Sequence, residues 1–152
     1  MCRICCFAGH SYIYNYEEVF EECLMIVTEL IENENVVEFW VGNYGDFDKL
    51  AAKVIRDLKE KYCHIKLNLV IPYITAEINL YKEFFYKNYD NILIADIPPK
   101  SPKKTQILKC NQYMIDNSFC LIAFVKNTFG GASKTLEYAK KQKNIKIINI
   151  AE

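Results

Sequence analysis

The residues best suited to hold an anion are two adjacent glycines near the C-terminus, Gly130 and Gly131. They stand between an apolar run typical of a buried strand and a segment with helical periodicity. Glycines let the backbone approach a ligand closely, and the first N–H groups of a helix have no partner within it. We therefore predict a phosphate site over residues 129–133, which includes Ala132 and Ser133. The same pattern is also typical of a tight turn without a ligand.

One carboxylate and one histidine could add chemistry to this turn. Glu137 follows Gly131 on the same predicted helix, where it could contact a ribose hydroxyl or act as a general base; a solvated helix glutamate is the equal alternative. His10 comes after Gly9 at the end of a predicted strand, and Ser11 adds a hydroxyl. A lone histidine also often has only a structural role. The chain contains no G-x-S-x-G sequence, so nucleophilic catalysis has no positive support.

Two further turns end predicted strands. They contribute these candidate ligand-binding residues: Gly42, Asn43, Tyr44 and Asp46 in the first turn, and Pro72 and Tyr73 in the second. Asp46 stands where the next helix should have its N-cap. The first turn matches neither G-x-G-x-x-G nor the Walker A pattern, so those modes of dinucleotide and triphosphate binding are not supported. The tyrosines could stack on a base or pack in the core.

The cysteines favour structural thiols. There are seven, scattered without framework spacing in a chain with no export signal, which predicts reduced thiols. Cys2 and Cys5 form a C-x-x-C sequence, but His10 and His64 are the only histidines and neither belongs to a second ligand pair. We predict no metal and no cofactor, with metal or redox work by this pair as the lesser alternative.

These residues must be positioned by elements that alternate along the chain. Strands are predicted at 4–8, 36–41, 64–71, 91–95, 119–125 and 145–150, helices at 16–32, 47–62, 74–89, 106–117 and 133–141, and a proline-rich loop at 97–104. Alternation implies parallel pairing with right-handed crossovers. We predict one α/β domain over 1–152: a single doubly wound, mainly parallel Rossmann-like sheet with helices on both faces. Such sheets bind ligands at the carboxyl ends of their strands.

Composition excludes several classes of protein. Lys and Arg number 19, as do Asp and Glu, so no net field favours nucleic acid or an anionic membrane surface. The apolar runs are too short to span a bilayer, and the first residues lack the build of a signal peptide. We therefore expect a cytoplasmic protein that binds neither membranes nor nucleic acid.

Four segments together resemble the SLOG superfamily, and within it the small YpsA-like proteins: CCFAGH at 5–10, FWVGNYGDFD at 39–48, NQYMID at 111–116 and FGGASKTLEYA at 129–139. The resemblance implies a Rossmann-like sheet that binds nucleotides or nucleotide-derived molecules. Relatives include phosphoribohydrolases, DNA-uptake proteins and sensor domains that bind ADP-ribose-type signals. Gly130 and Gly131 match the family's phosphate-binding glycines, and Glu137 matches the glutamate that serves catalysis in the phosphoribohydrolases.

The chain also departs from this family pattern. Ser11, Cys110 and Gln112 stand where relatives commonly carry arginines, which leaves Asn111 and the cation Lys109 as candidate ligand-binding residues on this helix. Arginine binds phosphate in a bidentate way that these replacements cannot reproduce. We therefore predict a non-catalytic binder of an ADP-ribose-type or cyclic nucleotide signal, acting as a sensor or a sequestering protein.

Two alternatives remain open. One is a hydrolase or transferase of an N-glycosidic bond, in which Glu137 serves as base or ribose anchor. The other is a partner-binding module with an empty cleft, which would use the aromatic residues of 73–89. The resemblance also implies a homo-oligomer, for which the sequence YKEFFY at 81–86 is the candidate contact.

Overall fold

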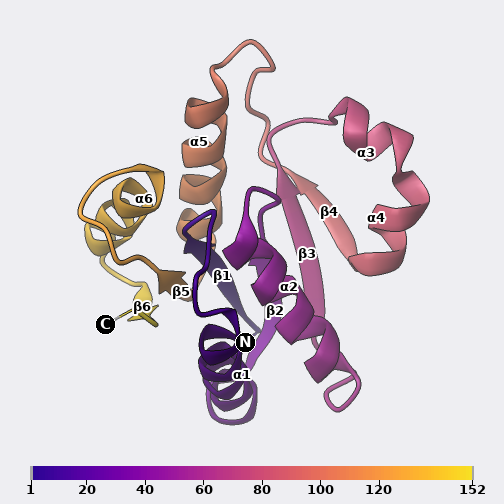
Figure 1. Cartoon of the computed structure of the whole chain (residues 1–152). Helices are drawn as coiled ribbons and strands as arrows, with labels where there is room; N and C mark the ends of the chain where they lie inside the picture. The colour runs from indigo at the N-terminus through magenta and orange to yellow at the C-terminus, as the bar shows by residue number, and fades with distance from the viewer. Residues whose placement is uncertain (1, 152) are drawn as a thin grey trace.

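The computed structural model describes residues 2–151, so both end positions of the predicted 1–152 domain lie outside the described residues. Six parallel strands form one sheet in the order β4-β3-β2-β1-β5-β6 (Figure 1). The strands are β1 (Arg3–Gly9), β2 (Val36–Val41), β3 (Lys66–Ile71), β4 (Asn91–Ile94), β5 (Cys120–Phe124) and β6 (Lys146–Asn149). The helices are α1 (Tyr16–Asn33), α2 (Asp46–Lys59), α3 (Ala76–Leu80), α4 (Lys82–Asn88), α5 (Lys103–Asp116) and α6 (Gly131–Lys140). The predicted doubly wound α/β sheet is confirmed.

Helices cover both faces of the sheet because successive strand residues point to opposite sides. In β1, Cys5 and Phe7 join the core under α1 and α2, whereas Cys6 and Ala8 join the core under α5 and α6. Figure 1 shows α1 and α2 in front of the strands, with α5 and α6 beside the β5 end. The buried cysteines pack as small apolar groups, and burial raises the pKa of Cys6 to about 12.

The strand order reverses at β1. From β1 the chain proceeds outward through β2, β3 and β4, then returns to the other side of β1 to form β5 and β6. The loops leaving β1 and β5 therefore run in opposite directions and leave a crevice at the carboxyl ends of these two strands. Strands β1 and β5 remain hydrogen-bonded up to their carboxyl ends, where the His10 N–H donates to the Phe124 carbonyl at 3.2 Å.

The predicted helices differ from the structure in their bounds by one to three residues at several ends, and two differences affect the site. The single helix expected over 74–89 is divided into α3 and α4, because Tyr81 has φ −113° and ψ 38°, outside the helical region. Helix α5 begins at Lys103 instead of 106, directly after Pro102, whose carbonyl accepts from the Gln106 N–H at 3.0 Å. The proline-rich loop is thus shorter than predicted.

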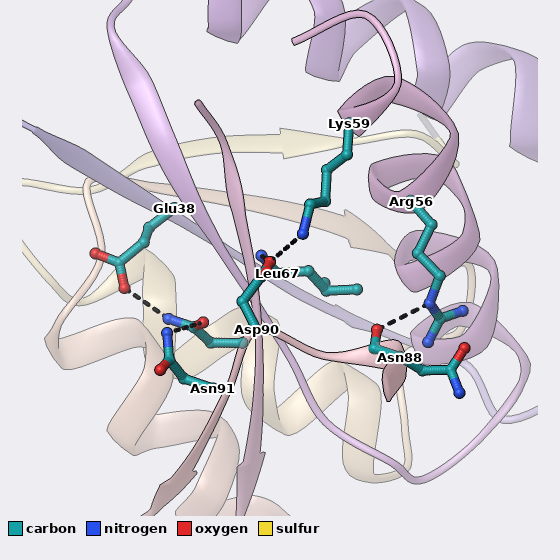
Figure 2. A network of polar contacts seen from close by, with 8 residues as sticks. Glu38, Arg56, Lys59, Leu67, Asn88, Asp90 and Asn91 are labelled. Carbon is teal, nitrogen blue, oxygen red and sulfur yellow. Dashed lines mark hydrogen bonds and ion pairs between the residues drawn. The ribbon is translucent and has the colours of Figure 1, made fainter. Parts of the chain in front are cut away.

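Polar contacts fasten the edge strand β4 to its neighbours (Figure 2). The Asp90 carboxylate accepts from the Leu67 N–H at 2.7 Å and pairs with Lys59 of α2. The Arg56 Nε donates to the Asn88 carbonyl at 3.0 Å. These contacts lie at the amino ends of β3 and β4, so they hold the sheet together away from its carboxyl edge. Within residues 2–151, no helix has the length and apolarity needed to cross a membrane.

Candidate ligand-binding site

A hollow of about 370 Å³ lies at the carboxyl ends of β1 and β5, and we call it the switch-point pocket. Its volume falls within the roughly 300–1,000 Å³ typical of small-molecule sites. It is lined by Ala8, Gly9, His10, Ser11, Tyr44, Gly45, Asp48, Lys104, Ile107, Asn111, Asn127, Phe129, Gly130, Gly131 and Ala132. Three separate loops and the first turns of α5 thus meet at one place.

Two glycines allow the loops after β1 and β2 to touch. A Cβ at Gly9 would lie 2.6 Å from the Phe47 ring, and a Cβ at Gly45 would lie 2.5 Å from the Ser11 Cα. Both distances are shorter than any side chain tolerates, so only glycine fits at either position. The contact is held by the Asp46 N–H, which donates to the Ser11 carbonyl at 2.9 Å. Gly9, Ser11 and Gly45 also line the pocket.

The N-terminus of α6 opens into the pocket without a cap. Gly130 has φ +93°, which favours glycine, and no side chain of residues 2–151 caps the first N–H groups of α6. A Cβ at Gly131 would meet nothing within 4 Å, so packing inside the protein does not require a glycine there. The free N–H groups and the positive end of the helix dipole suit an anion.

A relay of two side chains holds Asn111 beside this helix start. The Asn111 Nδ2 donates to the Thr135 Oγ1 at 3.1 Å, and the Thr135 hydroxyl donates to the Gly131 carbonyl at 3.0 Å. Thr135 is fully buried, so it acts through Asn111 and the backbone. The Asn111 oxygen has no hydrogen-bond partner among residues 2–151, which leaves an acceptor at the pocket wall.

His10 joins the two strand ends across the crevice. Its Nε2 accepts from the Lys126 N–H at 2.8 Å, which requires a neutral ring with its proton on Nδ1. Burial and the nearby Lys126 charge lower the pKa of His10 below its usual value, which favours this neutral form. His10 therefore has a structural bond at one nitrogen and presents the other to solvent or ligand.

Tyr44 and Asp48 form the wall between the loop after β2 and helix α5. The Tyr44 hydroxyl contacts the Cys110 Sγ at 3.7 Å, and burial raises the Tyr44 pKa, so the phenol stays protonated. The Asp48 carboxylate accepts from the Tyr44 N–H at 3.0 Å. Burial raises the pKa of Asp48 to about 6, although the bonds from the Tyr44 and Gly42 N–H groups lower it.

Asp48→Asn is expected to remove a pH dependence of stability. The folded pKa of about 6 lies above the ordinary 3.8, so between these values the folded protein retains a proton that the unfolded chain has lost. The free energy of unfolding of the wild type, relative to that of Asp48→Asn, should therefore fall as pH rises through this window, by on the order of 2 kcal/mol. Urea denaturation of both proteins at several pH values measures the difference, in which the His10 titration cancels. Parallel pH curves would contradict the assignment.

The structure distributes the predicted site residues over several surfaces. The switch-point pocket receives Gly9, His10, Ser11, Tyr44, Asn111, Gly130, Gly131 and Ala132. A neighbouring hollow receives Asn43, Pro72 and Tyr73 and shares Tyr44. Ser133 and Glu137 border a separate hollow on the other side of the α6 start, and Glu137 pairs with Lys140 at 3.4 Å. Gly42, Asp46 and Lys109 line none of these three hollows.

One predicted role is wrong and several pocket residues were missed. Asp46 is not the N-cap of α2: Gly45 has that position, and the Asp46 Oδ2 accepts from the Ile13 N–H at 3.1 Å, because the touching loops bring Ile13 within reach. The missed residues that contribute polar groups are Asp48, Asn127 and Lys104. The spacing of Lys104, Ile107 and Asn111 on one helical face could have revealed Lys104, had α5 been predicted to begin before 106.

The part of the chain that the structure describes contains no cluster of side chains suited to a metal ion. No group of three or more His, Cys, Asp or Glu side chains could hold an ion there. The seven cysteines are free thiols, with Cys2 exposed and Cys5 buried, so the two cysteines of the C-x-x-C sequence differ in environment.

Comparison with known proteins agrees with this architecture. The chain is 26% identical over 136 residues to the uncharacterized SPbeta prophage-derived protein YoqJ of Bacillus subtilis (strain 168), covering 80% of each chain. It is 28% identical over 141 residues to the UPF0398 protein BH1768 of Halalkalibacterium halodurans, covering 88% of this chain and 72% of that protein.

A solved structure shares the fold. The X-ray structure of DNA processing protein A (DprA) from Streptococcus pneumoniae superposes with a TM-score of 0.58 at 13% identity. The match covers 98% of this chain and 59% of DprA. Residues 12–151 match the family model YpsA, described as the YspA SLOG family. Because that match covers nearly the whole chain, the protein belongs to the YspA SLOG family.

Proposed function

We propose that this protein binds a phosphate-bearing, nucleotide-derived small molecule in the switch-point pocket and retains it intact, as a sensor or a sequestering protein. The observation that carries the proposal is the uncapped start of α6. Gly131 has open space at its Cβ position and borders the pocket, so its lack of a side chain benefits a ligand rather than the protein core.

Charge at the pocket supports an anionic ligand of limited charge. Among the described residues that line the pocket, Lys104 is the one lysine or arginine, and the half-buried carboxyl of Asp48 is the one acidic group. A single lysine and a helix N-terminus suit one or two phosphates better than a triphosphate with its metal. Nucleic acid is not part of the proposal, because equal numbers of basic and acidic residues give the chain no net positive charge to attract it.

The position of Glu137 supports binding without cleavage. Its side chain is 61% exposed, forms an ion pair with Lys140 and borders a hollow separate from the switch-point pocket. A general base must come within hydrogen-bond reach of the reacting group. Glu137 in this arrangement is a solvated helix residue, which disfavours hydrolysis of an N-glycosidic bond.

The test is a thermal-shift screen joined to recovery of the bound compound. The screen contains AMP, ADP-ribose, cyclic ADP-ribose isomers and cyclic dinucleotides. At about 100 times its dissociation constant, a true ligand adds about 2.7 kcal/mol and raises the melting temperature by roughly 5–10 °C. Mass spectrometry of the compound released on heating should find it intact. A cleaved product would establish the hydrolase or transferase alternative, and no shift with any compound would favour the partner-binding alternative.

Two lysines of α5 provide a matched pair of variants for this screen. Both are exposed, but Lys104 lines the pocket and Lys109 does not. Lys104→Gln is expected to weaken the identified ligand about fivefold, because one charge-assisted contact is lost. Lys109→Gln should leave the affinity unchanged. The reverse result would indicate that the anion binds on the outer face of α5 and not in the switch-point pocket.

We also propose that the protein self-associates through the surface of α3 and α4, and that it works in the cytoplasm. Four large apolar side chains are exposed on this short segment: Leu80, Tyr81, Phe84 and Tyr86. Several large exposed apolar side chains on one short segment are typical of protein contacts. Light scattering at high concentration should give a mass above that of one chain, and Phe84→Glu should return it to 17.8 kDa. A monomer in the wild type would contradict the proposal.

A further inference from the structure

The hollow next to the switch-point pocket has a different set of lining residues. We call it the Tyr73 pocket; its volume is about 470 Å³, and it lies at the carboxyl ends of β2 and β3 beneath the first turn of α5. Its lining includes the neutral polar residues Asn43, Thr75, Ser101 and Gln106 and the apolar residues Pro72 and Ile78. Its two charged residues, Lys103 and Glu77, have opposite signs. A pocket that combines neutral hydrogen-bonding groups with apolar side chains, and whose two charges cancel, suits a nucleoside better than a second phosphate.

Gln106 carries an acceptor that the protein itself does not use. The side chain is only 9% exposed. Its Nε2 donates to the Pro99 carbonyl at 3.1 Å and to the Ser101 carbonyl at 2.9 Å, and these two carbonyls fix which end of the amide is the nitrogen. The Oε1 is left with no donor among residues 2–151. The Oε1 is not fully enclosed and Gln106 lines the Tyr73 pocket, so this oxygen can accept a hydrogen bond from a ligand donor in place of water.

The two pockets meet at one residue. Tyr44 lines both, and its hydroxyl contacts Cys110 of α5, so the ring forms the partition between them. Helix α5 contributes residues to both pockets. Lys104 and Asn111 border the switch-point pocket. Lys103 and Gln106 border the Tyr73 pocket. A ligand that placed its phosphate at Gly131 could therefore extend past Tyr44 into the second pocket.

We propose that the Tyr73 pocket holds the nucleoside of the ligand and selects a base with an exocyclic amine, which donates to the Gln106 Oε1. This inference rests on the proposed function, because it assumes that the phosphate lies at the start of α6. Adenine and cytosine carry such an amine, whereas hypoxanthine and uracil present a carbonyl at the same position. A carbonyl there would face the Gln106 oxygen with two acceptors and no proton between them.

Isothermal titration with matched nucleotides tests this selection. The wild type should bind AMP about tenfold more tightly than IMP, and CMP about tenfold more tightly than UMP, because in each pair the exocyclic donor that faces Gln106 is replaced by an acceptor, while the adjacent ring nitrogen changes from acceptor to donor. Ribose 5-phosphate should bind more weakly than AMP, because it leaves the Tyr73 pocket empty.

A variant that fills the Tyr73 pocket with a larger side chain provides a second test. Ser101→Leu puts a bulky group at the pocket wall and keeps the Ser101 carbonyl bonded to Gln106, whereas Lys100→Leu puts the same side chain on the same loop outside the pocket. Ser101→Leu should bind AMP and IMP equally and no better than ribose 5-phosphate, and Lys100→Leu should behave as the wild type.

The outcomes separate the two proposals. If AMP, IMP and ribose 5-phosphate bind the wild type equally and Ser101→Leu changes nothing, the Tyr73 pocket is not the nucleoside site, although the phosphate site stands. If AMP and ribose 5-phosphate fail to bind but another compound of the thermal-shift screen binds, this inference falls and the proposed function stands. If no compound of the screen binds, both fall. A preference for AMP that survives in Ser101→Leu would place base recognition elsewhere and also overturn the inference.

Discussion

Replacing Gly131 by aspartate is expected to make the free protein more stable while removing its affinity for phosphate. Gly131 is the first residue of α6, its Cβ would have open space, and its N–H is uncapped. A carboxylate at a helix start and the loss of glycine's backbone freedom should together raise the free energy of unfolding by about 0.5–1.5 kcal/mol. The same charge occupies the anion site, so we expect the affinity for AMP to fall about 100-fold.

Gly131→Ala is the matched control for this prediction. Alanine restricts the backbone in the same way but adds no charge, so its stability should also rise, by a smaller amount. Its affinity for AMP should stay within a few fold of the wild type. Urea denaturation measures the stabilities and isothermal titration the affinities. If Gly131→Asp binds AMP as the wild type does, the ligand's phosphate does not lie at the start of α6.

The opposite behaviour is expected at Gly45, where alanine should destabilise the fold. The added Cβ would lie 2.5 Å from the Ser11 Cα, which is backbone and cannot turn aside as a side-chain end would. Its φ of 167° is ordinary extended backbone, so the cost is steric and not conformational. Separating the two loops would also strain the bond from the Asp46 N–H to the Ser11 carbonyl. We expect a loss of about 2–3 kcal/mol and a melting temperature lower by roughly 5–10 °C.

Calorimetry of Gly45→Ala beside Gly131→Ala separates packing from function. Both variants add one methyl group at a glycine that borders the switch-point pocket. The first should melt well below the wild type, and the second at or above it. Equal melting temperatures for the two variants would mean that the loops after β1 and β2 do not touch as described.

Local sequence patterns determined the elements and identified many of the residues that line the switch-point pocket. Apolar runs flanked by turn residues identified the strands, and alternation with helices was enough to predict a parallel sheet with ligands at its carboxyl edge. The Gly130–Gly131 turn was found for the same reason: glycines before a helix change the backbone locally, and this effect is readable without knowing the fold.

Positions that depend on an irregular backbone could not be predicted as well. Tyr81 has no proline or glycine next to it, so its departure from the helical region, which divides 74–89 into two helices, leaves no local signal. The start of α5 was placed too late because three prolines over 98–102 suggested a loop, and so Lys104 was left out of the site.

What the sequence by itself determined was the order and type of the elements, because hydrophobic periodicity is a property of neighbouring residues. Only the tertiary structure decided which turns share a pocket. The loops after β1 and β5 meet because the strand order reverses at β1, and Asp48, Tyr44 and Gln106 acquire their environments from residues distant in the chain. Burial, pKa and hydrogen-bond satisfaction are set by all the groups around an atom, so they exist only after the chain has packed.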